Sequence, residues 1–73
     1  MNIPHLVKMA NQIGRFFEAE PDRTQAVKDI ATHLKRFWDP SMRKAIVAHV
    51  KGGGDGLLPI VLQAVTENQQ LLA

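Results

Sequence analysis

The sequence predicts an all-α protein, a small bundle of three to four short helices. Apolar residues recur at the three- and four-residue spacing of one helix face through most of the chain. No segment alternates apolar and polar residues over the length of a useful strand. Because a chain of 73 residues is the size of one domain, we expect a single helical unit over residues 1–73.

The first helix is expected from Pro4, which suits a first-turn position, to Phe17. Gly14 lies inside this pattern, where a small residue allows another segment to approach closely, and we expect that contact within this domain. The apolar stripe of this helix is formed by Leu6, Ala10, Ile13 and Phe17. Met9 and Phe16 flank the stripe.

The second helix follows an acidic turn at residues 18–22 and extends to about Phe37. The third helix is expected from Pro40 to Lys51, with Asp39 as its N-cap and Gly52 as a left-handed residue at its end. The apolar stripe of the second helix is Ala26, Val27, Ile30, Ala31, Leu34, Phe37 and Trp38. That of the third is Met42, Ala45, Ile46, His49 and Val50.

Five residues rich in glycine, 52–56, are interpreted as a flexible hinge before the last helix. They follow a helix rather than a strand and lack the Lys-Ser/Thr pair of a phosphate-binding loop. The last helix is expected from near Pro59 towards Leu71, with a polar tail at residues 67–70 that frays.

The composition favours a protein that depends on a partner. A domain of this size forms a marginal core, and the chain has no cysteine for a disulfide or a thiolate metal site. The absence of cysteine is typical of a cytoplasmic protein. Nine Lys and Arg against seven Asp and Glu form too weak an excess to imply nucleic acid. The apolar runs are far shorter than the roughly 20 residues of a membrane span, and the N-terminus does not resemble a signal peptide.

Residues able to perform catalysis or bind metal are not grouped in the sequence. The histidines His5, His33 and His49 lack the four-residue spacing of a helical metal site, and His49 is interpreted as half-buried and hydrogen-bonded. Ser41 and the threonines stand at ordinary cap or surface positions, without a motif that activates a nucleophile. We therefore predict that this chain is not an enzyme and binds no metal or cofactor itself.

Two adjacent aromatic residues, Phe37 and Trp38, stand at the corner between the second and third helices, beside several cations. Since Trp and Arg are enriched in binding hot spots, this corner is the first candidate for protein binding. The predicted partner-binding residues are Asn11, Gln12, Arg15, Arg36, Phe37, Trp38 and Arg43.

Two sequence blocks resemble a known family. Residues 6–17, LVKMANQIGRFF, and residues 33–43, HLKRFWDPSMR, are similar to the delta subunit of soluble NAD-dependent formate dehydrogenases that contain molybdenum or tungsten. The glycine-rich stretch, the following Leu-Pro and the last helix also match the family's layout. The sequence departs at Leu58, where the family often has a capping serine before the proline.

The resemblance implies a non-catalytic accessory subunit that assembles or stabilises the enzyme, or aids insertion of its bis-molybdopterin guanine dinucleotide cofactor. It implies the large (alpha) subunit and its complex as partner. The cofactor, the iron–sulfur clusters, FMN and NAD are then bound by other subunits. Two alternatives stay open: a small basic nucleic-acid-binding protein, and a chaperone that binds the dinucleotide cofactor through Arg15, Arg36 or Arg43.

Overall fold

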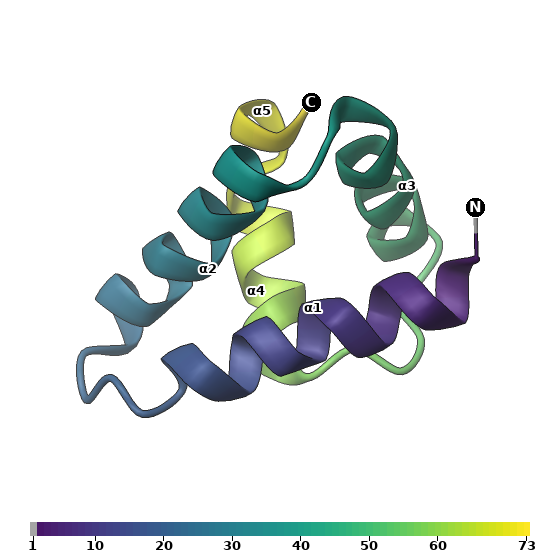
Figure 1. The fold of residues 1–73 in the computed structure, drawn as a ribbon. Helices are drawn as coiled ribbons and strands as arrows, with labels where there is room; N and C mark the ends of the chain where they lie inside the picture. The colour runs from purple at the N-terminus through teal and green to yellow at the C-terminus, as the bar shows by residue number, and fades with distance from the viewer. Residues whose placement is uncertain (1) are drawn as a thin grey trace.

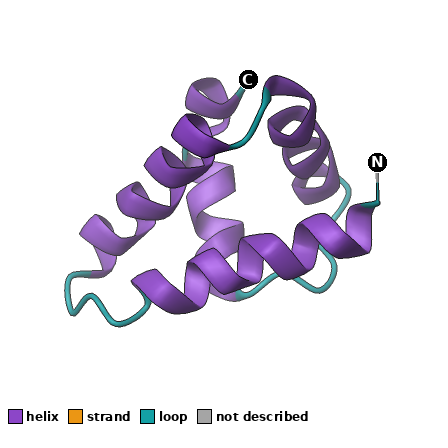
Figure 2. Cartoon of the chain, viewed as in Figure 1, coloured by secondary structure: helices purple, strands orange, loops and turns teal. Residues whose placement is uncertain are grey.

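The computed structural model describes residues 2–73, which form four helices and one final helical turn (Figure 1). No strand occurs among these residues, so the all-α prediction is confirmed (Figure 2). The elements are α1 (Ile3–Phe17), α2 (Arg23–Phe37), α3 (Pro40–Lys51), α4 (Pro59–Glu67) and α5 (Gln69–Leu72).

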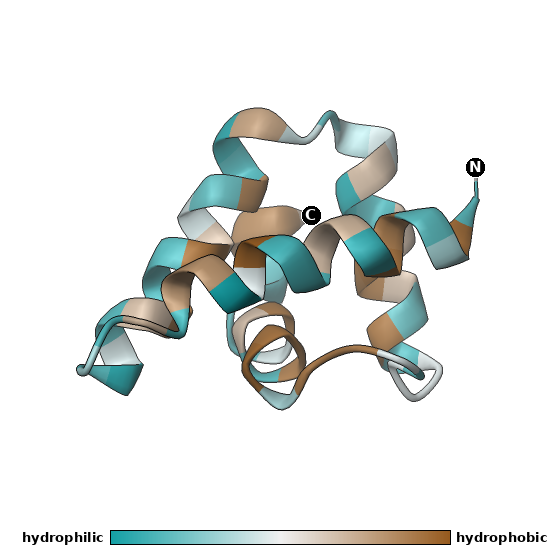
Figure 3. Cartoon of the chain, turned by 60° about the horizontal axis from the view of Figure 1, so that its bottom comes forward, coloured by the Kyte–Doolittle hydropathy of each residue, from teal (hydrophilic) through white to brown (hydrophobic). Residues whose placement is uncertain are grey.

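The central element is α4, which contacts all the other helices. In Figure 1, α1 and α2 diverge from the turn that joins them, with α4 between them and α3 opposite α2. The short α5 contacts both α2 and α3. Hydrophobic and hydrophilic residues alternate along the helices, as expected where each helix buries one face (Figure 3).

Side-chain caps fix the starts of the first three helices. Asn2 accepts a hydrogen bond from the His5 N–H (3.1 Å), and Asp22 accepts one from the Gln25 N–H (3.3 Å). Asp39 accepts from the Met42 N–H (2.9 Å), and Pro40 is the first residue of α3, as predicted. These bonds satisfy backbone donors that have no partner inside the helix.

The core is formed by aliphatic side chains from all five helices, together with Trp38. Its largest fully buried members are Ile30, Leu34, Ile46, Ile60, Val61, Val65 and Leu72. A Cβ atom added to Gly14 would lie 2.5 Å from Cγ2 of Val61, so the predicted close packing at this glycine within the domain is confirmed.

Phe37, placed by the sequence both in the apolar stripe of α2 and at the candidate protein-binding corner, is 70% exposed. Two local predictions were wrong. Gly52 has an ordinary φ of −85°, and the left-handed residues are Gly53, Gly54 and Gly56. The tail after α4 does not fray: it forms α5 and buries Leu72 completely, since α2 and α3 leave an apolar site there.

Candidate docking groove

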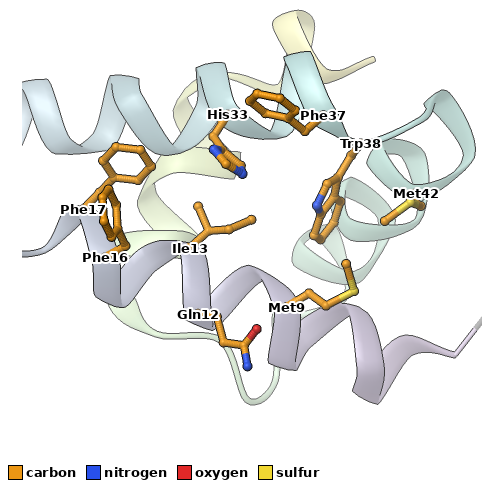
Figure 4. A pocket seen from close by; sticks show the side chains of 9 residues that line it. All are labelled: Met9, Gln12, Ile13, Phe16, Phe17, His33, Phe37, Trp38 and Met42. Carbon is orange, nitrogen blue, oxygen red and sulfur yellow. The ribbon is translucent and has the colours of Figure 1, made fainter.

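A groove of about 630 Å³ lies between α1 and α2 and ends at the start of α3 (Figure 4). Its walls are apolar or aromatic apart from Gln12 and His33, and no lysine, arginine or carboxylate is among its lining residues. We call it the docking groove; it is lined by Met9, Gln12, Ile13, Phe16, Phe17, His33, Phe37, Trp38 and Met42.

The α1 wall is a second face of that helix, beside the face that enters the core. The core face consists of Leu6, Ala10 and Gly14, whereas Met9, Ile13 and Phe16 face the groove. Met9 and Ile13 are half-buried against the core, but Phe16 is 75% exposed. This helix therefore has a wider apolar surface than the bundle itself covers.

Aromatic rings cross the groove from one helix to the other. The rings of Phe16 and Phe17 meet edge to face, with centroids 5.0 Å apart. Phe17 lies 6.0 Å from His33 on α2, and His33 lies 4.7 Å from Phe37, one helical turn further along. Figure 4 shows Phe16 and Phe17 at one end of the groove and Trp38, Met9 and Met42 at the other.

The adjacent residues Phe37 and Trp38 have opposite environments. Trp38 is the C-cap of α2 and has an extended backbone (ψ 139°), so the chain leaves the helix there. The Trp38 side chain is only 5% exposed and packs in the core, while Phe37 stays on the open side of the groove. Trp38 therefore forms the floor of the groove and Phe37 part of its exposed wall.

The corner beneath Trp38 is fixed by Arg43. Its Nη1 donates to the carbonyl oxygens of Lys35 (2.9 Å) and Trp38 (3.3 Å), which end α2 without a helical partner. A cation at this position also complements the negative end of the helix dipole. The structure thus gives the Arg43 guanidinium an intramolecular role.

Asn11 also has an intramolecular role. Its Nδ2 donates to the Gly56 carbonyl (2.9 Å), and its Oδ1 accepts from the Leu58 N–H (2.9 Å). These bonds hold the loop that precedes α4, whose N-cap Leu58 has no capping side chain of its own.

The remaining predicted contact residues lie at different places around the groove. Gln12 lines it, and Arg36 lines a smaller adjoining hollow next to Phe37. Arg15 is exposed but lines none of these hollows. The sequence analysis did not identify Met9, Ile13, Phe16, Phe17, His33 and Met42 as site residues. The one available signal was the pair Met9 and Phe16, which flank the apolar stripe of α1 and widen it.

The residues 2–73 contain no cluster of three or more His, Asp or Glu side chains that could hold a metal ion. His49 is half-buried and its Nε2 donates to the Asp55 carbonyl (2.8 Å), which confirms its predicted environment. An iron–sulfur cluster requires cysteine ligands, which this chain lacks, so its residues do not fit such a group. Within the same residues, no helix has the length and apolar character needed to cross a membrane.

The model of one protein family matches residues 5–65, which is most of the chain. That family is described as the NADH-dependent formate dehydrogenase delta subunit, FdsD. No curated protein and no solved structure gives a significant match.

Proposed function

This chain belongs to the NADH-dependent formate dehydrogenase delta-subunit family, and we propose that it acts as a non-catalytic accessory subunit of that enzyme. In this proposal it binds the large (alpha) subunit in the cytoplasm and helps the complex to assemble or remain stable. Formate oxidation, bis-molybdopterin guanine dinucleotide, the iron–sulfur clusters, FMN and NAD are assigned to the other subunits.

The observation that supports this function best is the apolar docking groove on so small a chain. Phe16 and Phe37 are 75% and 70% exposed on its rim, although they belong to different helices. Burying one such side chain contributes about 1.5–3 kcal/mol, so a partner that covers both gains substantial binding energy. Contiguous exposed apolar surface of this kind is typical of protein-binding sites.

The expected contact residues divide into two groups under this proposal. Gln12, Arg36 and Phe37 contact the partner directly, since they are exposed at or beside the groove. Trp38 and Arg43 support this surface from inside the domain: Trp38 forms the floor of the groove, and Arg43 hydrogen-bonds the backbone at the α2–α3 corner. Asn11 positions the loop before α4. Arg15, which is exposed on the outer side of α1, contacts the partner outside the groove.

We further propose that the chain aids insertion of the dinucleotide cofactor by holding the large subunit, and not by binding the cofactor itself. Arg43 is engaged with backbone carbonyls, Arg15 lies outside the groove and Arg36 lies on its rim. Because these three cations do not converge on one hollow, they offer no common site for a pyrophosphate. This arrangement favours contact with protein over contact with cofactor.

The experiment is a deletion of this chain in its host, followed by purification of formate dehydrogenase. We expect lower NAD-linked formate oxidation and lower molybdenum content per large subunit, and both should recover when the chain is supplied again. Unchanged activity and unchanged molybdenum content, under conditions where the chain is normally expressed, would refute the accessory role.

A further inference from the structure

We propose that Asp55 is a site of isoaspartate formation, in which its side chain closes onto the backbone nitrogen of Gly56. Asn11 and His49 restrain this reaction by holding the backbone of the loop that carries the site. In the product, Asp55 is linked to Gly56 through its β-carboxyl group, which lengthens the backbone by one atom. This inference concerns the glycine-rich loop and is independent of the docking groove and of the proposed function.

Asp55 is followed by glycine, unlike the other three aspartates, which are followed by Arg, Ile or Pro. Closure of an aspartate side chain onto the next backbone nitrogen is easiest before glycine, because glycine has no Cβ to shield that nitrogen. The fold favours glycine at this position. Gly56 has φ +85°, which residues with a Cβ rarely adopt, and a Cβ there would lie 3.4 Å from Cγ1 of Val7. The backbone therefore maintains the reactive pair.

The two reacting groups of this pair have no hydrogen-bond partner within residues 2–73. Asp55 is exposed, and within these residues only its backbone carbonyl accepts a hydrogen bond. The Gly56 N–H donates to no acceptor there, although the N–H groups of Gly54 and Leu57 both do. Neither reacting group has to leave a partner first, so the reaction is limited by the freedom of the backbone around them.

Side chains from two helices hold that backbone on either side of the reacting nitrogen. His49 on α3 donates from Nε2 to the Asp55 carbonyl (2.8 Å), and Asn11 on α1 donates from Nδ2 to the Gly56 carbonyl (2.9 Å). The ring closes only in a narrow range of rotation about the bond between Cα and the carbonyl carbon of Asp55, and His49 holds that carbonyl in place. The rate of the reaction is therefore set by how often the loop opens locally.

The reaction needs no reagent other than water. The Gly56 nitrogen attacks Cγ of the protonated Asp55 carboxyl group: the N–Cγ bond forms, the bond from Cγ to the hydroxyl breaks, and the hydroxyl leaves as water with the amide proton. The resulting five-membered succinimide ring then takes up one water. Hydrolysis of the bond between the nitrogen and the former backbone carbonyl carbon gives isoaspartate, whereas hydrolysis of the N–Cγ bond restores aspartate.

Isoaspartate at this position disrupts the contacts that hold the loop. The Asp55 carbonyl that His49 holds becomes a free carboxylate, and the added backbone atom displaces Gly56 from Asn11. The side chain of Asn11 also accepts from the Leu58 N–H, at the start of α4. The modification therefore loosens the entry to α4, the helix that contacts all the others.

The test follows isoaspartate in the purified full chain during incubation at neutral pH. A protein isoaspartate methyltransferase with S-adenosylmethionine measures its amount, and electron-transfer mass spectrometry of proteolytic peptides locates it. We expect isoaspartate to accumulate at Asp55 roughly fivefold faster or more in Asn11→Ala and in His49→Leu than in wild type, because each variant lacks a bond that holds the loop. Gln12→Ala, also on α1 but without a hydrogen bond to the loop, should match wild type. Asp55→Glu should form none at this position.

Ile30→Val separates release of the loop from a general loss of stability. Ile30 is fully buried on α2, so the smaller side chain destabilises the domain without removing a loop contact, and its rate should stay close to that of wild type. Equal rates in wild type, Asn11→Ala and His49→Leu would overturn the restraint. A rate in Ile30→Val as high as in Asn11→Ala would assign the reaction to global unfolding and also overturn it. Absence of isoaspartate at Asp55 from all of these chains would overturn the site itself.

Discussion

The side-chain amide of Asn11 hydrogen-bonds the backbone of Leu58 across 47 positions of the sequence. The Leu58 N–H donates to Oδ1 at 2.9 Å, while Nδ2 donates to the Gly56 carbonyl, also at 2.9 Å. One amide thus satisfies a donor and an acceptor in the loop that enters α4. It stabilises the start of a helix whose N-cap residue has no side chain able to do so.

Asn11→Ala should therefore destabilise the protein, although this substitution changes the exposed surface of the protein little. Loss of both hydrogen bonds should lower the free energy of unfolding by about 1–3 kcal/mol, because Leu58 is left with an unpaired backbone donor. Urea denaturation of the two proteins measures this difference. Gln12→Ala is the matched control on the same helix and should change stability by less than about 0.5 kcal/mol; equal effects of the two variants would contradict the role of Asn11.

In the glycine-rich loop, the effects of alanine substitution at two glycines, Gly54 and Gly52, can be compared. Gly54 is buried with φ +67°, and a Cβ there would collide with the side chain of Leu62. Gly52 has φ −85°, and the nearest atom to a Cβ there is 3.6 Å away. We expect Gly54→Ala to lower the free energy of unfolding by about 1–3 kcal/mol, a loss of several degrees in Tm, and Gly52→Ala to have almost no effect. Thermal denaturation with equal Tm values for both variants would show that the loop tolerates side chains, as a flexible hinge does.

The environments of Trp38 and Phe37 predict opposite effects of truncation. Trp38→Ala removes a buried aromatic side chain and should cost about 3–5 kcal/mol, a large fraction of the stability of a small domain. Phe37→Ala should leave the Tm nearly unchanged and instead reduce recovery of the partner subunits. Thermal denaturation combined with quantitative copurification distinguishes the two, and a strong loss of stability in Phe37→Ala would contradict its exposed position.

Asp39 should contribute a pH-dependent term to stability. The Ser41 hydroxyl and the Met42 N–H both donate to its carboxylate, which lowers the pKa of Asp39 below its usual 3.8. A carboxyl group with a lowered pKa in the folded state stabilises the protein above about pH 4 and loses that effect as the pH falls through the folded-state pKa. The Tm difference between wild type and Asp39→Asn should thus be largest near neutral pH and shrink towards pH 2. A difference that is constant across this range would contradict the assignment.

Local sequence signals predicted the helices well. Asp39 and Pro40 set the start of α3, and the apolar spacing placed α1 and α2 within a residue or two. These features depend on backbone groups and side chains only three or four positions apart. The resemblance of two blocks to the delta-subunit family was confirmed by the match over residues 5–65.

The groove was harder to predict because it depends on tertiary packing. Phe37 and Trp38 share one apolar stripe in a helical projection, yet the chain leaves the helix at Trp38 and separates their side chains. The contact between Asn11 and Leu58 joins residues 47 positions apart, and no local pattern indicates it. The turn at Asn68 and the burial of Leu72 likewise depend on the site that α2 and α3 form together.

The measurement that tests the central claim most directly is recovery of formate dehydrogenase on a tagged chain carrying both Phe16→Ser and Phe37→Ser. Both side chains are largely exposed, so helicity and Tm should match wild type and the variant is a test of binding alone. If the docking groove binds the enzyme, recovery of the other subunits should fall about tenfold or more. Full recovery with a normally folded double variant would show that the enzyme does not bind through this groove.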